Sequence, residues 1–182
     1  MKEEKPTTPS NETSKDNDKI QKLNELLKKL LIDPTEKLEP PKKAWFMVEG
    51  TLELILGTLG NFSLVTGKAK SKKSFFINIA VSAAVSGNVT CNKFKSELPK
   101  EHNNVLYFDT EQGRYHVQLA LKRICMQIKI EEPTNLKVYG LRSLKPSKRL
   151  ELIEHAIYNT PYIGLVVIDG IKDLVTSINS EE

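Results

Sequence analysis

The chain contains the sequence Gly67-Lys68-Ala69-Lys70-Ser71-Lys72-Lys73-Ser74, which lies between an apolar run at 62–65 and an apolar segment at 75–85. Its spacing is typical of a phosphate-binding loop, in which Gly, four residues, Gly, Lys and Ser or Thr connect a strand to a helix. Backbone N–H groups of such a loop, together with the positive end of the helix, point toward phosphate oxygens. The octapeptide therefore predicts a phosphate site, with a lysine-rich surface turn as the alternative.

One position of this loop departs from the usual pattern, because Lys72 stands where the second glycine belongs. A residue with a side chain costs about 1–3 kcal/mol there if its φ is positive. In the phosphate-site interpretation, Lys73 neutralises the terminal phosphates and Ser74 ligates magnesium. The residues assigned to nucleotide binding are Gly67, Lys70, Ser71, Lys72, Lys73, Ser74 and Phe75.

The length and composition are those of one domain with an accessory segment, since the chain has 182 residues. It contains no run of about 18 apolar residues, and Met1 to Lys19 has no apolar signal-peptide core. We therefore expect a cytoplasmic protein without a membrane segment. Cys91 and Cys125 are expected to be free thiols, because they are far apart and form no Cys-x-x-Cys pair.

Positive charge gathers around the phosphate loop. Residues 66–100 carry seven lysines against the single acid Glu97, although the formal net charge of the chain is only +4. This distribution suits an anionic ligand, either nucleotide phosphate or a nucleic-acid backbone. A solvated basic loop remains the alternative.

The N-terminal part differs in character from the rest. Residues 1–17 lack apolar periodicity and predict a disordered tail, whereas Asp18 to Leu31 carries apolar residues at three- and four-residue spacing. Residues 18–43 are therefore an amphipathic helix followed by a proline-rich linker, and 44–182 form the main domain. The helix packs on its own domain or docks on a neighbouring subunit.

The main domain alternates strands with helices. We expect a hairpin or short strands over 44–60, a buried strand over 61–66, and a loop over 87–103. Helices are expected over 72/73–86, 114–129 and 146–159, and further strands over 104–109, 136–141 and 162–169. This order predicts an α/β fold with a mostly parallel sheet flanked by helices.

Acidic residues follow two of the expected strands. Asp109 and Glu111 come after one, and Asp169 ends another. In a parallel sheet, ligands bind at the carboxyl ends of the strands. Asp169 is expected to hold magnesium, with a helix-capping role as the alternative. Glu111 is the candidate catalytic residue because it can activate the attacking water, and Gln112 either senses the phosphate or begins a helix.

The ordered set of 65–75, 107–112 and 164–170 resembles the RecA-type ATPases, most closely the RepA and DnaB-like branch of Bacteroides-type mobile elements. The resemblance covers about residues 40–182. It implies an ATP site at a subunit interface of a homo-oligomer, with a hexamer as one possibility, and single-stranded DNA as a partner. It also implies that Glu111 is the general base, that Lys73 contacts phosphate, and that Ser74 and Asp169 hold Mg²⁺.

The chain departs from that family after Asp169, because only thirteen residues follow it. The family inserts another core strand between the phosphate-loop strand and the Asp169 strand, and later segments carry DNA-binding loops and trans-acting arginines. We therefore expect an incomplete RecA-like core, either a truncated product or the N-terminal portion of a longer protein.

Three functions follow from these features. The first is an ATPase acting in DNA replication or mobilisation of a mobile element. The second is a nucleotide-binding module that does not hydrolyse ATP, which Lys72 favours. The third is a DNA-binding accessory protein that works without nucleotide through the lysines of 66–100.

Overall fold

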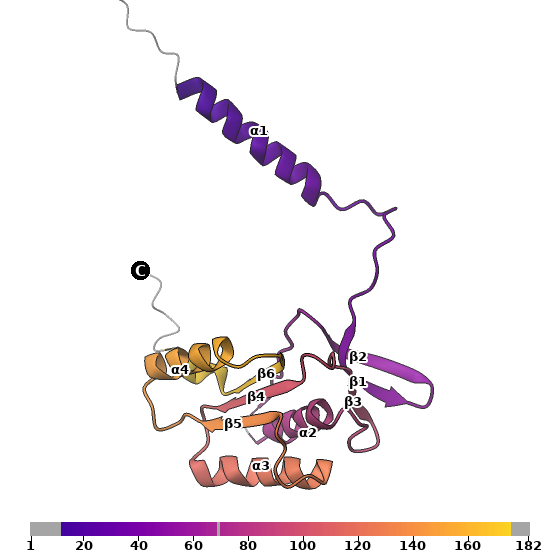
Figure 1. Cartoon of the computed structure of the whole chain (residues 1–182), viewed down its shortest axis with the longest axis vertical. Helices are drawn as coiled ribbons and strands as arrows, with labels where there is room; N and C mark the ends of the chain where they lie inside the picture. Colours follow the sequence, from indigo (N-terminus) through magenta and orange to yellow (C-terminus); the bar gives the residue numbers. More distant parts are fainter. Residues whose placement is uncertain (1–11, 69, 176–182) are drawn as a thin grey trace, which may run out of the picture. The chain divides into compact units, whose positions relative to one another are not determined.

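The computed structural model describes residues 12–68 and 70–175, and its contacts divide the chain between Pro40 and Pro41. The first unit carries one helix, α1 (Glu12–Leu30), which begins upstream of the expected start at Asp18 (Figure 1). Of the predicted disordered tail, residues 1–11 lie outside the described residues.

Within residues 41–68 and 70–175, the second unit contains two three-stranded sheets. The antiparallel sheet has the order β2-β1-β3, and the parallel sheet has the order β5-β4-β6. The strands are β1 (Lys43–Glu49), β2 (Leu52–Thr58), β3 (Phe94–Ser96), β4 (Asn104–Asp109), β5 (Leu136–Gly140) and β6 (Ile163–Asp169). The helices are α2 (Lys73–Ser86), α3 (Arg114–Ile128), α4 (Pro146–Tyr158) and the short 3₁₀ helix η1 (Ile171–Leu174). The predicted α/β fold is confirmed, as is the hairpin β1–β2, whereas β3 lies within the expected loop 87–103.

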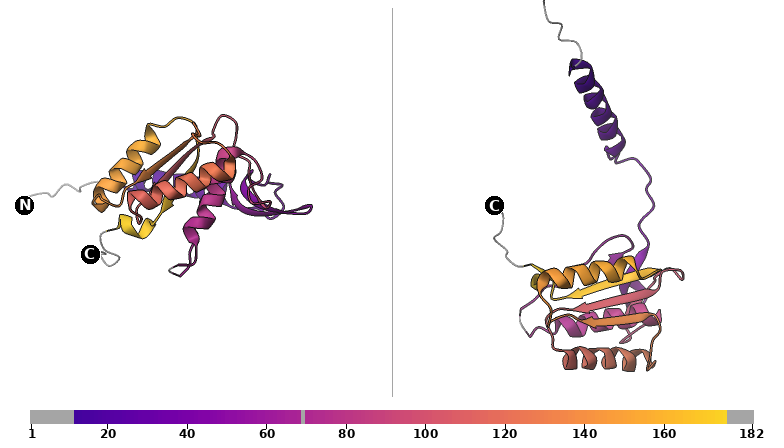
Figure 2. Two further views of the ribbon diagram at one scale, coloured as in Figure 1. Left: turned by 90° about the horizontal axis from the view of Figure 1, so that it is seen from below. Right: turned by 60° about the vertical axis from the view of Figure 1, so that its left-hand side comes forward.

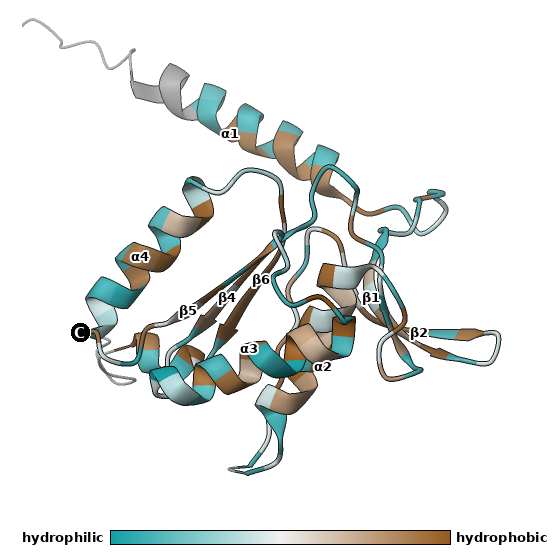
Figure 3. Cartoon of the chain, turned by 60° about the horizontal axis from the view of Figure 1, so that its bottom comes forward, coloured by the Kyte–Doolittle hydropathy of each residue, from teal (hydrophilic) through white to brown (hydrophobic). Residues whose placement is uncertain are grey.

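Strand β4 is the centre of the parallel sheet and is covered on both faces. Val105 and Tyr107 pack with Val81 and Ile124 of α2 and α3, whereas Leu106 and Phe108 pack on the opposite face toward α4 and η1. Side chains alternate across a strand, so one continuous apolar run supplies both cores. Figures 2 and 3 show α4 and α3 on opposite sides of the sheet and the apolar character of its strands.

The prediction of a buried strand over residues 61–66 is wrong. This segment is irregular, and Phe62 is 93% exposed and Leu64 is 67% exposed. A strand needs a ladder partner, and among the described strands the outer edge of β6 is unpaired. The core strand that the resemblance inserts between this segment and β6 has no counterpart in the described residues, so the free edge of β6 is not extended toward the apolar run.

Helix α2 is nevertheless anchored on the sheet. Its C-terminal residues Val81, Ala84 and Val85 pack against the β4 side chains, and the Asn135 side-chain amide just before β5 donates to the Val85 carbonyl at 3.1 Å. The helix therefore runs opposite to the strands, and its N-terminus is directed toward their carboxyl ends.

Cys91 and Cys125 are both free, as expected. Within 12–68 and 70–175, no helix combines the length and the apolar character needed to cross a bilayer.

Candidate functional site

Two carboxylates meet where β4 and β6 end. Asp109 is the register partner of Asp169, and the two residues are only 1% and 7% exposed. The Tyr107 hydroxyl donates a hydrogen bond to Oδ2 of Asp169 at 3.1 Å. Burial first, and then the two carboxylates, raise the pKa of Tyr107 well above its ordinary value, so the phenol keeps its proton.

Asp109 shapes the loop that follows β4. Its Oδ1 accepts hydrogen bonds from the backbone N–H groups of Glu111 at 3.0 Å and Gln112 at 2.7 Å. Its Oδ2 is buried without a hydrogen-bond partner among the described residues. Burial raises the pKa of Asp109, and the Asp169 carboxylate adds to this, although the Gln112 N–H opposes it. Asp109 is thus a loop-forming residue rather than a base exposed to substrate water.

Thr110, the residue after Asp109, connects the ends of β4 and β6. Its hydroxyl lies 3.1 Å from the carbonyl of Asp169 and 2.7 Å from that of Gly170. Gly170 has φ 96°, and an added Cβ would collide with the Glu111 and Thr110 side chains. The glycine therefore lets the loop bearing Glu111 lie directly against the turn after Asp169.

Glu111 is the accessible carboxylate of the group, since its side chain is 42% exposed. It forms an ion pair with Lys172 of η1, with 3.3 Å between Oε1 and Nζ. Both residues line a cavity of about 590 Å³ that also includes Arg142, Arg149 and Asp173. A carboxylate beside such a cavity can contact water, which the predicted role of Glu111 requires.

The phosphate loop is held by its own backbone. The Lys73 ammonium donates to the carbonyls of Gly67 at 3.0 Å and Lys68 at 3.1 Å. Lys70 and Lys72 both have φ 63°, so the glycine position of the motif does carry the left-handed conformation that we considered. A Cβ on Gly67 would lie 2.6 Å from the Ser71 hydroxyl oxygen, so a larger residue there would require the exposed Ser71 side chain to turn away.

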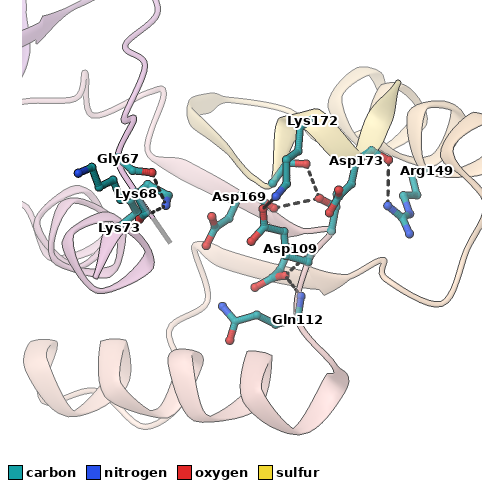
Figure 4. A network of polar contacts seen from close by, with 12 residues as sticks. Gly67, Lys68, Lys73, Asp109, Gln112, Arg149, Asp169, Lys172 and Asp173 are labelled. Carbon is teal, nitrogen blue, oxygen red and sulfur yellow. Dashed lines mark hydrogen bonds and ion pairs between the residues drawn. The ribbon is translucent and has the colours of Figure 1, made fainter. Parts of the chain in front are cut away.

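The loop and the carboxylates lie on the same face of the sheet. Tyr107 and Asp109 share the β4 face that α2 covers, because Tyr107 packs with Val81 and side chains alternate along a strand. Val167 of β6 packs against the same cluster, so Asp169, two residues later, also lies on this face. Figure 4 shows Lys73 on one side of Asp169 and Lys172 and Asp173 on the other. No hydrogen bond or ion pair between described residues joins the loop to Asp169 directly.

The remaining loop residues are open to ligand. Lys70, Ser71 and Lys72 are exposed, Ser74 is half-buried in the first turn of α2, and Phe75 is 49% exposed. The first N–H groups of a helix have no partner within the helix, so this turn can bind an anion.

The residues fit a magnesium ion better than a softer metal. The buried, unpartnered Oδ2 of Asp109 and the carboxylate of Asp169 are hard oxygen donors, and the Ser74 hydroxyl is a third oxygen. The described residues contain no group of three or more His, Cys, Asp and Glu side chains that could hold a metal. Magnesium needs only one or two carboxylates when substrate phosphates and water complete its shell, so this finding is compatible with it.

Several supporting residues were missed by sequence reasoning. Tyr107 could have been found, because it lies two residues before Asp109 and so faces the same way. Arg149 could not, since its guanidinium donates to three backbone carbonyls brought together by the fold, those of Leu144, Asp173 and Arg142. It fixes η1 to the start of α4, and Lys172 likewise meets Glu111 only in the folded chain.

Comparison with known proteins gives one finding. A protein-family model described as "AAA domain" matches residues 16–182. The match includes most of α1 and therefore begins upstream of residue 40, where the resemblance in the sequence began. No curated protein and no solved structure matches the chain.

Proposed function

Because the chain belongs to the AAA domain family of RecA-like P-loop ATPases, we propose that it hydrolyses ATP at the carboxyl edge of its parallel sheet and acts in DNA replication or mobilisation of a mobile element. The family establishes an AAA-type P-loop ATPase domain and implies a nucleotide site, typically with Mg²⁺. The residue roles and the link to DNA are our proposal.

One observation carries the proposal. The Asp109–Asp169 register brings two carboxylates to adjacent strand ends on the face covered by α2, and the loop that bears Glu111 follows directly after Asp109. The N-terminus of α2, which bears Lys73 and Ser74, is directed to the same edge. The edge thus offers hydrogen-bond donors for phosphate, buried carboxylate oxygens and one accessible carboxylate.

Each residue then has a distinct role. The Lys73 ammonium exchanges its loop carbonyls for the terminal phosphates of ATP, while the first-turn N–H groups of α2 receive the phosphate oxygens. Glu111 orients a water molecule and accepts its proton as the water oxygen attacks the terminal phosphorus and ADP leaves. Ser74 and Asp169 would hold Mg²⁺, which neutralises charge on the phosphate oxygens when bound.

The proposed DNA role rests on charge. Lys68, Lys70 and Lys72 are exposed in the loop, within the lysine-rich segment 66–100. A cluster of this kind attracts a phosphate backbone, with an affinity that falls as salt rises. Single-stranded DNA and further copies of the chain are the partners that the family resemblance favours.

A second function is favoured by two contacts. Lys73 is engaged by its own loop carbonyls, and Glu111 is paired with Lys172. If these contacts persist with nucleotide bound, the chain would bind ATP without turnover and act as a regulatory module.

Phosphate release from ATP, measured with and without single-stranded DNA, tests the proposal and separates the two functions. We expect Lys73→Ala to lower nucleotide affinity about 10- to 100-fold, because one hydrogen bond to a charged group contributes about 1.5–3 kcal/mol. Glu111→Gln should retain binding and lose turnover by about 100-fold or more. Lys122→Ala and Glu101→Gln are matched controls at exposed positions away from the loop.

The outcomes are distinct. Binding without phosphate release, with no effect of Glu111→Gln, would favour the regulatory module. Salt-sensitive DNA binding that is indifferent to both ATP and Lys73→Ala would favour the nucleotide-independent accessory protein instead. Failure of the unsubstituted chain to bind ATP would refute the assigned site.

A further inference from the structure

We infer that Tyr107 is the positioning residue for Asp169, and that its hydroxyl holds this carboxylate in the orientation that receives the divalent cation of the nucleotide. The inference rests on the proposed function, because it assigns a further residue to the same site. Tyr107 touches neither nucleotide nor cation in this role and acts through Asp169 alone.

The contact is direct and buried. The phenolic oxygen lies 3.1 Å from Oδ2 of Asp169, and the two residues are 0% and 7% exposed. An ionised carboxylate only accepts hydrogen bonds, so the phenol is the donor. Bonds from a donor to a charged acceptor are the stronger ones, particularly where water is excluded.

The tyrosine is itself held firmly. Its ring lies in the core cluster with Val81 and Ala84 of α2 and Ile124 of α3, so the hydroxyl has little freedom to move away. Because Oδ2 is tied to this hydroxyl, rotation of the Asp169 carboxylate about its Cβ–Cγ bond is restricted. The direction of Oδ1 is thereby set before a cation arrives.

The neighbouring strand offers a matched comparison. Tyr139 of β5 stacks on Phe108 with 5.2 Å between ring centroids and an interplanar angle of 14°. Its ring lies toward the opposite face, in the cluster of Leu106 and Phe108. Removing the Tyr139 hydroxyl therefore alters a tyrosine of the same sheet without touching Asp169.

The test is a magnesium titration of nucleotide binding by the 182-residue chain. Affinity for a fluorescent ATP analogue is measured by anisotropy in EDTA and over a range of Mg²⁺ concentrations. Tyr107→Phe should raise the Mg²⁺ concentration for half-maximal enhancement by about 10-fold, within the range seen when a supporting contact to a metal ligand is lost. Affinity in EDTA should stay unchanged, and Tyr139→Phe should match the unsubstituted chain.

A double variant separates positioning from packing. If Tyr107 acts through Asp169, Tyr107→Phe combined with Asp169→Asn should give the same Mg²⁺ dependence as Asp169→Asn alone. A Tyr107→Phe midpoint equal to that of Tyr139→Phe would overturn the inference, as would equal losses of affinity in EDTA and in Mg²⁺. Loss of all ATP binding by the unsubstituted chain would instead overturn the proposed function, and this inference with it.

Discussion

Asp109 and Asp169 are buried at the ends of paired strands, whereas Lys70 and Lys72 of the phosphate loop are exposed and both stand at φ 63°. Asp169 is held by the Tyr107 hydroxyl and Asp109 by the N–H groups of Glu111 and Gln112, and the ladder of β4 and β6 fixes the backbone of both. The loop is held mainly from within, by Lys73 bonds to the carbonyls of Gly67 and Lys68.

This difference separates what the folded core fixes from what a ligand must complete. Groups locked by packing and strand pairing need no reorganisation when substrate binds, which favours electrostatic stabilisation of a reaction. A loop closed on its own lysine must exchange those bonds for phosphate. We therefore expect the sheet edge to contribute a preformed acidic site and the loop to contribute the part that responds to nucleotide.

The largest expected effect compares a core residue beneath the carboxylates with a residue of the segment before the phosphate loop. Phe108→Ala should lower the free energy of unfolding by about 3–5 kcal/mol, because it opens a cavity beside Tyr139 and Leu106. Phe62→Ala, in the segment before the loop, should change it by less than about 0.5 kcal/mol, since Phe62 is 93% exposed.

Urea unfolding followed by circular dichroism measures both variants. Similar losses for the two would mean that the segment before the loop is packed in solution. The contrast between a core-supported edge and a self-supported loop would then be wrong.

The contrast between the packed sheet edge and the exposed loop also explains which parts of the structure could be predicted from the sequence. Strands β4 and β6 were predictable because each is a compact apolar run that ends in an aspartate, and Asp109, Glu111 and Asp169 follow from their ends. Tyr107 was within reach through strand alternation. The Glu111–Lys172 and Arg149 contacts join residues distant in sequence and depend on the folded turn after Asp169.

Residues 61–66 show where prediction of structure from local sequence fails. Their apolar character is that of a strand, but strand formation depends on a neighbour with free backbone groups, which local sequence does not specify. The left-handed lysine was more tractable, because the motif itself specifies a glycine at position 72. The pattern therefore indicated where a positive φ had to be considered, and Lys72 has φ 63° although the residue is not glycine.

An intermediate effect is expected from relieving the backbone strain at position 72 of the loop. Lys72→Gly should raise the free energy of unfolding by about 0.5–1 kcal/mol, because a left-handed residue with a Cβ costs about 1–2 kcal/mol and the added chain entropy of glycine offsets part of this. Lys72→Ala is the matched control, since it removes the charge and keeps the strained Cβ. It should leave stability nearly unchanged.

Thermal and urea unfolding measure these two variants, and ATP affinity is determined alongside. A gain shared by Lys72→Gly and Lys72→Ala would show that charge repulsion among the loop lysines, rather than backbone strain, limits the loop. The stability of the loop would then be limited by repulsion between its lysine side chains and not by its left-handed backbone.

The smallest expected effect concerns the one acidic group that the core does not hold. Glu111 and Lys172 are 42% and 71% exposed, so their ion pair should be screened by water and salt. A double-mutant cycle of Glu111→Gln and Lys172→Met should give a coupling energy below about 0.5 kcal/mol, similar to the exposed Lys148–Glu151 pair on α4. Glu111 would then be free to leave Lys172 for water at little cost. A coupling above about 1 kcal/mol that persists in high salt would place Glu111 among the fixed groups instead, and the carboxylate edge would lack the mobile base that the proposed hydrolysis uses.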